Sequence, residues 1–175
     1  YVVGSGDDRV SDPTNLDRER GATPFHQAHT FAVSTVIAPE VAGTGWAVAV
    51  ANNNQLGLIL QANSGLPFNI RSRTDLNLDG VTNDRPTGFE RNAGRLGRVV
   101  YLDLRYSRFI PAGDTRRIEL FFEAKNLFNT ENVASVTRDV TTTATGDLSA
   151  PLPSPFPPQS AYDQRQMQLG FKFAF

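Results

Sequence analysis

Residues 166–175 read QMQLGFKFAF, in which apolar side chains alternate with polar or small ones. The apolar positions are Met167, Leu169, Phe171, Phe173 and Phe175. This period of two predicts a β-strand, because successive side chains of a strand point to opposite faces. A soluble strand would bury its apolar face on a core, but a strand of about 9–11 residues can also cross a bilayer at a tilt. The stretch alone leaves both alternatives open.

The same alternation occurs in four earlier stretches, HTFAVSTVI, QLGLILQAN, VVYLDLRYSRF and RRIELFFEAKN. Strands are therefore predicted near residues 29–38, 55–63, 99–110, 116–127 and 167–175. The sequence PAGDT at 111–115 predicts a tight turn. Proline, glycine, asparagine and threonine interrupt every stretch long enough for a helix, so we predict none. The expected fold class is all-β, an antiparallel meander of about five strands.

The connections between these strands differ in length. Residues 1–28, 71–98 and 128–165 are long and polar, whereas 111–115 is short and 39–54 is intermediate. If the last strand ends in the periplasm, every long connection lies outside the cell, which is typical of outer-membrane barrels. We therefore expect about five transmembrane strands with long extracellular loops. Because the smallest bacterial barrels have about eight strands, we expect residues 1–175 to be part of a larger barrel.

The two faces of the predicted strands differ in polarity. The expected lumen-facing residues are Asp103, Arg105, Glu119, Glu123, Lys125 and Lys172, and lipid is expected on the apolar face. Arg108 falls on the lipid-facing parity, so we expect it at the headgroup level or displaced by a β-bulge. The aromatic residues Trp46, Phe109, Phe173 and Phe175 are expected near the periplasmic rim.

Composition excludes several classes of function. The 175 residues carry a net charge of −1, which gives no electrostatic basis for nucleic-acid binding. The sequence holds no cysteine and two histidines close together, so no cysteine nucleophile and no Ser-His-Asp triad is expected. No apolar run reaches the roughly 18 residues of a transmembrane helix. We predict that the chain is not an enzyme.

One polar loop resembles a calcium-binding loop. Its oxygen-bearing side chains are Asp75, Asn77, Asp79, Asn83 and Asp84. The first four have the EF-hand spacing with Gly80 at the sixth position, but Pro86 occupies the position of the bidentate glutamate. Calcium is therefore one hypothesis, and an ion-free turn rich in Asp and Asn is the favoured one.

Four stretches together carry a family resemblance, and they read SGLPFNI, DLNLDGVTNDRP, ELFFEAKNLFN and RQMQLGFKFAF. They resemble the C-terminal part of TonB-dependent outer-membrane receptors, in particular the Oar-like subgroup with an N-terminal carboxypeptidase-regulatory-like domain. The resemblance runs from about Arg18 to the last residue and implies the closing segment of a barrel of about 22 strands.

This resemblance also implies partners. Phe171, Phe173 and Phe175 would form the signal by which the barrel assembly machinery recognises the C-terminal strand. TonB would act through an N-terminal region outside this chain, and the receptor would bind and take up a bulky extracellular ligand. Two other functions stay open: a secreted β-sandwich binding module with a calcium-binding loop, and an outer-membrane barrel for adhesion or protein export.

Overall fold

The computed structural model describes residues 10–12, 14–113 and 115–174. They form two compact units, each built from three separate segments. The sheet unit comprises His29–Asn63, Val99–Asn132 and Tyr162–Phe175, and the loop unit comprises Tyr1–Ala28, Ser64–Arg98 and Val133–Ala161. In the described part of the chain, no helix has the length and apolar character needed to span a membrane.

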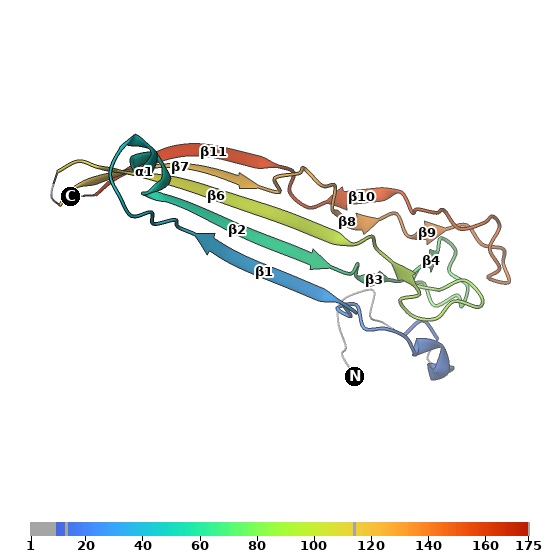
Figure 1. Ribbon diagram of the computed structural model, residues 1–175. Helices are drawn as coiled ribbons and strands as arrows, with labels where there is room; N and C mark the ends of the chain where they lie inside the picture. Colours follow the sequence, from blue (N-terminus) through green and yellow to red (C-terminus); the bar gives the residue numbers. More distant parts are fainter. Residues whose placement is uncertain (1–9, 13, 114, 175) are drawn as a thin grey trace. The chain divides into compact units, whose positions relative to one another are not determined.

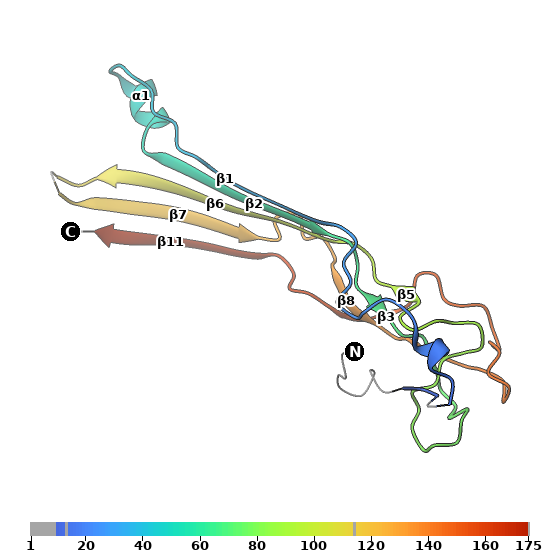
Figure 2. The same ribbon diagram turned by 90° about the horizontal axis from the view of Figure 1, so that it is seen from below.

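The sheet unit contains one antiparallel sheet of five strands (Figures 1 and 2). Its strands are β1 (Thr30–Ile37), β2 (Asn54–Asn63), β6 (Val99–Pro111), β7 (Arg117–Lys125) and β11 (Gln166–Ala174). They are hydrogen-bonded in the order β1-β2-β6-β7-β11, so each strand lies beside the one that precedes it among the five. The predicted all-β meander is confirmed.

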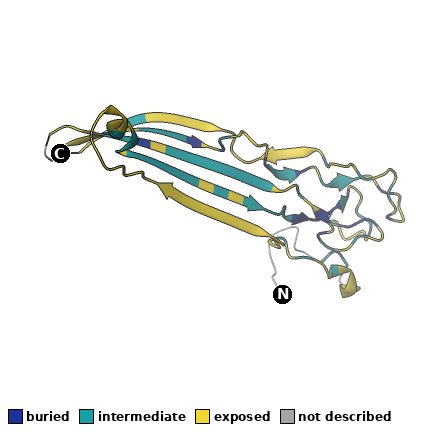
Figure 3. Ribbon diagram, viewed as in Figure 1, coloured by how far each residue is buried: buried dark blue, intermediate teal, exposed yellow. Residues whose placement is uncertain are grey.

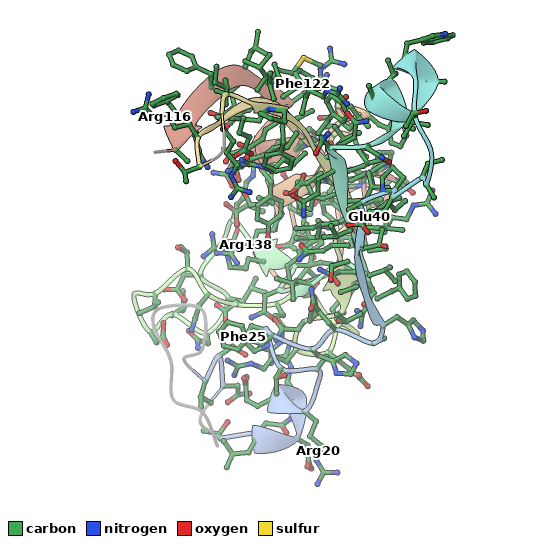
Figure 4. All side chains as sticks on the ribbon, turned by 60° about the vertical axis from the view of Figure 1, so that its left-hand side comes forward. Arg20, Phe25, Glu40, Arg116, Phe122 and Arg138 are labelled. Carbon is green, nitrogen blue, oxygen red and sulfur yellow. The ribbon has the colours of Figure 1, made fainter. Side chains whose placement is uncertain are left out.

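The register aligns the alternating apolar positions of the five strands on one face of the sheet, with a few apolar residues such as Phe121 on the other. One row across the sheet joins Thr35, Leu58, Leu104, Ala124 and Met167. The next row is Ile37, Leu56, Tyr106, Phe122 and Leu169. We call this side the apolar face and the opposite side the polar face; the side chains are drawn in Figure 4, where Phe122 of the apolar face is labelled.

The apolar face is not covered by a core. β1 is exposed along its whole length (Figure 3), and on β11 the side chains of Leu169 and Phe171 are 82% and 74% exposed. A soluble domain of this size would bury such residues, because exposed apolar patches of this extent are rare in soluble monomers.

The connections within the sheet unit contain one helix that the sequence analysis did not predict. Helix α1 (Trp46–Ala51) lies between β1 and β2, so the prediction of no helix is wrong. Between β6 and β7, the Ala112 N–H donates to the Arg116 carbonyl at 2.9 Å, and Gly113 adopts a φ of 105°. This second connection is the tight turn that the sequence predicted.

The loop unit consists of short elements from all three long connections. The 3-10 helix η2 spans Leu16–Glu19, and the short strands pair as β3 (Pro67–Phe68) with β5 (Gly94–Arg95), β4 (Arg71–Ser72) with β9 (Asp139–Val140), and β8 (Val133–Val136) with β10 (Pro158–Ala161). The β4–β9 pair is parallel and the others are antiparallel.

A small apolar core holds this unit together. Phe68, Ile70 and Val136 are buried, and the ring of Phe156 packs edge-on against Phe68 with centroids 5.2 Å apart. The residues of this core come from two connections that are far apart in the sequence, so the long connections form a folded body.

Candidate functional site

The centre of the polar face is a network of ion pairs. Arg105 on β6 donates to Glu119 at 2.8 Å and also to Glu123, its cross-strand partner on β7. The Ser107 hydroxyl donates to the same Glu119 oxygen at 2.8 Å, and Gln168 on β11 donates to Glu123. Both carboxylates therefore accept hydrogen bonds from donors on neighbouring strands.

An aromatic ring lies inside this network. The Arg105 guanidinium lies 4.6 Å from the centroid of the Phe121 ring, and the Lys172 ammonium lies 5.4 Å from it. A cation over a ring face is attracted by the ring quadrupole. Gly170 is the cross-strand partner of Phe121, and a Cβ atom added there would lie 2.5 Å from the ring. The absence of a side chain at Gly170 therefore leaves room for the Phe121 ring.

The remaining predicted lumen residues lie on the same face but outside the network. Asp103 accepts a hydrogen bond from the backbone N–H of Asn126 at 2.8 Å, which holds the end of β7 against β6. Lys125, opposite Gln166, is exposed. The six predicted residues comprise three acids and three bases, so the polar face is hydrophilic without a strong net charge.

The loop unit contains a buried ion-pair cluster that the sequence analysis did not predict. Glu19 accepts hydrogen bonds from Arg85 at 2.6 Å, from Arg91 at 2.9 Å, and from both the backbone and hydroxyl of Ser11. The side chains of Arg85 and Glu19 are 1% and 6% exposed. Burial alone would raise the pKa of Glu19, but the hydrogen bonds from Arg85 and Ser11 outweigh it and lower the pKa to about 2. Glu19 is therefore charged throughout the physiological range.

The loop from Asp75 to Asp84 is closed by its own backbone. Asp75 accepts the N–H groups of Asp79 and Gly80, and Asp79 accepts that of Val81 at 2.8 Å. The Asn77 side chain accepts the Asp79 N–H at 3.0 Å, and Asp84 accepts the Leu76 N–H at 2.6 Å.

These hydrogen bonds give four of the five residues of the calcium hypothesis partners within the protein, so the loop can hold this conformation without an ion. The fifth, Asn83, has a buried Oδ1 with no hydrogen-bond partner among the described residues. Over the described ranges, His, Cys, Asp and Glu side chains form no group of three suited to a metal. The ion-free turn fits this geometry, and calcium binding stays a prediction.

Comparison with known protein families identifies the cellular location of the sheet. The family model described as "Outer membrane beta barrel domain" matches residues 2–98, which is more than half of the chain. The chain belongs to this family. It is an outer-membrane barrel protein of a Gram-negative-type bacterium. No curated protein and no solved structure matches it.

Membership in the outer membrane beta barrel family explains the exposed apolar face. In such barrels, apolar residues face lipid and alternate with polar residues that face the lumen. The location in the outer membrane removes the secreted β-sandwich from consideration, and contact of the apolar face with lipid stays a prediction. The lumen-facing assignment of Asp103, Arg105, Glu119, Glu123, Lys125 and Lys172 stays a prediction, and their common position on the polar face of the barrel wall supports it.

The phenylalanine residues expected near the ends of the barrel strands do not all lie on the same face of the sheet. Phe171 and Phe173 lie on the apolar face of β11 and are 74% and 51% exposed, whereas Phe175 lies outside the described residues. Phe109 pairs with Glu119 and lies 5.3 Å from the Arg117 guanidinium, so it is on the polar face. Phe109 therefore does not share the apolar face with Phe171 and Phe173, and its expected place near the periplasmic rim stays a prediction.

Arg108 lies on the apolar face of β6, and no β-bulge displaces it. The register runs without interruption through the pairs Asn54–Arg108 and Arg108–Leu120. Of the two explanations that the sequence offered, the bulge is wrong. The Arg108 guanidinium instead binds carbonyl groups of the α1 segment, a contact that strand periodicity could not indicate.

Proposed function

We propose that this outer-membrane barrel segment belongs to a TonB-dependent receptor that binds a bulky extracellular ligand and takes it up. The observation that supports the proposal most is the folded state of the long connections. All three contribute to one compact unit with its own apolar core and buried ion pairs.

The chain topology assigns these connections to one side of the membrane. The start of β1, the end of β2, the start of β6, the end of β7 and the start of β11 are at the same end of the antiparallel sheet. The tight turn after Pro111 is at the other end. Outer-membrane barrels have short periplasmic turns and longer extracellular loops, so the long connections are extracellular.

Preorganisation of these connections suits a ligand-binding surface. Arg71 on β4 donates to Asp139 on β9 at 2.9 Å, and the Arg85 guanidinium binds Glu19 from the first connection. Loops already fixed by such contacts lose less conformational freedom when a ligand binds. A barrel that only conducts small solutes has no need for a folded extracellular body of this kind.

Coupling to TonB is the part of the proposal that rests on the family resemblance. The resemblance is carried by four stretches that occur in the expected order along the chain: SGLPFNI, DLNLDGVTNDRP, ELFFEAKNLFN and RQMQLGFKFAF. We also propose that Phe171, Phe173 and Phe175 act as the assembly signal of the barrel.

The experiment uses the intact receptor and the purified periplasmic domain of TonB. We expect saturable binding between them by surface plasmon resonance, and loss of binding when the receptor's N-terminal region is removed. In planar bilayers, the intact receptor should conduct no steady current, because a plug domain fills a receptor of this class. An open pore with no affinity for the TonB domain would overturn the proposal and favour export. Absence of both pore and TonB binding would favour adhesion.

A further inference from the structure

Arg108 projects from a lipid-facing surface, where a cation is costly unless it finds partners. It lies between Asn54 and Leu120 across the strands, and Tyr106 and Ile110 flank it on the same face of β6. Its guanidinium donates to the carbonyl groups of Ala49 at 2.7 Å, Val50 at 3.0 Å and Asn52 at 2.5 Å. These carbonyls belong to the C-terminal end of α1 and to the residue that follows it.

Two side chains, those of Arg108 and Asn54, cap the C-terminal end of α1. Asn54 donates to the carbonyls of Val50, Ala51 and Asn52, and its own Oδ1 accepts the Tyr106 hydroxyl at 2.7 Å. The last carbonyls of a helix have no partner within the helix and carry a partial negative charge. Arg108 and Asn54 together supply the donors that these groups lack.

This cap explains why a helix forms in an alternating apolar sequence. Six residues are too few for a stable helix in isolation, because the first turn is costly to nucleate. The helix of WAVAVA therefore depends on its contacts with Asn54 on β2 and Arg108 on β6.

The contact between Arg108 and α1 also determines on which side of the sheet the helix lies. Because the Arg108 side chain extends from the apolar face, the helix that it binds lies on the lipid side of the sheet. Figures 1 and 2 show α1 at the end of the sheet where β2 starts, which is the periplasmic end. In α1, the side chains of Trp46 and Val50 are 81% and 60% exposed, and no residue of the helix is charged.

We propose that α1 is an interfacial anchor that inserts Trp46 and Val50 into the periplasmic leaflet of the outer membrane. The occupant of its exposed surface is phospholipid, since this surface continues the lipid-facing band and carries no charge. Tryptophan prefers the boundary between acyl chains and headgroups. Arg108 positions the helix there and has its charge satisfied by the helix carbonyls. The inference concerns membrane anchoring and does not depend on ligand uptake.

The test measures the depth of Trp46 in the intact protein, reconstituted into phosphatidylcholine vesicles. The signal of Trp46 is the difference in fluorescence between the parent and Trp46→Phe. We expect this signal to be quenched several-fold more by phospholipid brominated near the top of the acyl chain than by phospholipid brominated near its end. It should resist quenching by aqueous iodide.

Two arginine variants separate anchoring from general stability. Arg108→Gln should lower the lipid quenching of Trp46 at least two-fold, because the helix loses its cap. Arg117→Gln, which removes an arginine from the polar face at the same end of the sheet, should leave the quenching unchanged. Heat-modifiable gel mobility shows whether each variant is folded.

Three results would overturn the proposal. Quenching of Trp46 by iodide and not by brominated lipid would place α1 in water. Protection from both quenchers would place it against another protein or a second copy of the chain. Unchanged lipid quenching in folded Arg108→Gln would show that Arg108 does not position the helix.

Discussion

Arginine substitutions at two neighbouring residues distinguish the faces of the barrel wall. Leu58 and Ile59 lie at the centre of β2 (Asn54–Asn63), and their side chains point to opposite faces. Leu58 lies between Thr35 and Leu104 on the apolar face, and Ile59 lies between Ser34 and Asp103 on the polar face. Both are apolar, so the pair is matched in depth and chemistry.

The expected costs follow from the surroundings of each side chain. Arginine on the lipid face near the bilayer midplane destabilises a barrel by about 2–4 kcal/mol. At Ile59, which is 46% exposed, arginine would face the lumen beside the Asp103 carboxylate, where an opposite charge contributes roughly 0.2–1 kcal/mol favourably. Leu58→Arg should therefore lower the folding equilibrium by about 30- to 700-fold, whereas Ile59→Arg should leave it within a few-fold of the parent.

The assay follows the folded fraction of the intact barrel protein in lipid vesicles by heat-modifiable gel mobility across a urea series. Leu58→Arg should unfold at clearly lower urea concentration than both Ile59→Arg and the parent. If the two variants lose equal stability, or if Ile59→Arg loses more, the assignment of lipid and lumen faces is wrong.

Three further predictions address other parts of the chain. Deleting Phe175 should sharply lower the outer-membrane level of the intact protein in cells, while the purified variant still refolds in detergent; equal levels in cells would remove the assembly-signal proposal. Glu19 has a pKa lowered from 4.5 to about 2, so its stabilising contribution, roughly 3 kcal/mol at most, is complete above pH 4.5 and is lost as the pH falls toward 2. Hydrogen exchange of the loop unit should show this loss in the parent and not in Glu19→Gln, and an identical pH dependence in both would contradict the role of Glu19. Gly170→Ala should destabilise the barrel by about 1–3 kcal/mol because a Cβ would clash with the Phe121 ring; Phe121→Leu should reduce that cost, and additive effects in the double variant would exclude the contact.

Strand positions and faces could be predicted from the sequence because they depend on a local period of two. The polar partners of Arg105 follow once the strands are paired, since Glu123 lies directly across from it. The ring of Phe121 over Gly170 could also have been inferred from the register of β7 and β11, because a glycine opposite an aromatic residue leaves room for the ring.

The helix and the loop unit could not be predicted in this way. WAVAVA has the composition of a strand as much as that of a helix, and the donors that cap it come from Asn54 and from Arg108 on a different strand. Glu19 and Arg85 are 66 residues apart in the sequence, and although Arg85 lies in the stretch DLNLDGVTNDRP, nothing in that stretch indicates Glu19 as its partner. Such contacts depend on the path of the whole chain, so composition identified the long connections only as polar.

The central claim is that these strands cross the outer membrane with the long connections outside the cell. Residues 1–175 contain no cysteine, so in an otherwise cysteine-free version of the protein a single introduced cysteine can report the side of the membrane on which it lies. Thr82→Cys is in the long connection between β2 and β6, Ala112→Cys is in the tight turn after β6, and both positions are exposed.

The measurement is labelling of these two variants in intact cells with a membrane-impermeant maleimide. The cysteine at position 82 should be labelled in intact cells, and the cysteine at position 112 should be labelled only after the outer membrane is permeabilised. The opposite pattern, or equal labelling of both in intact cells, would contradict the proposed crossing of the membrane.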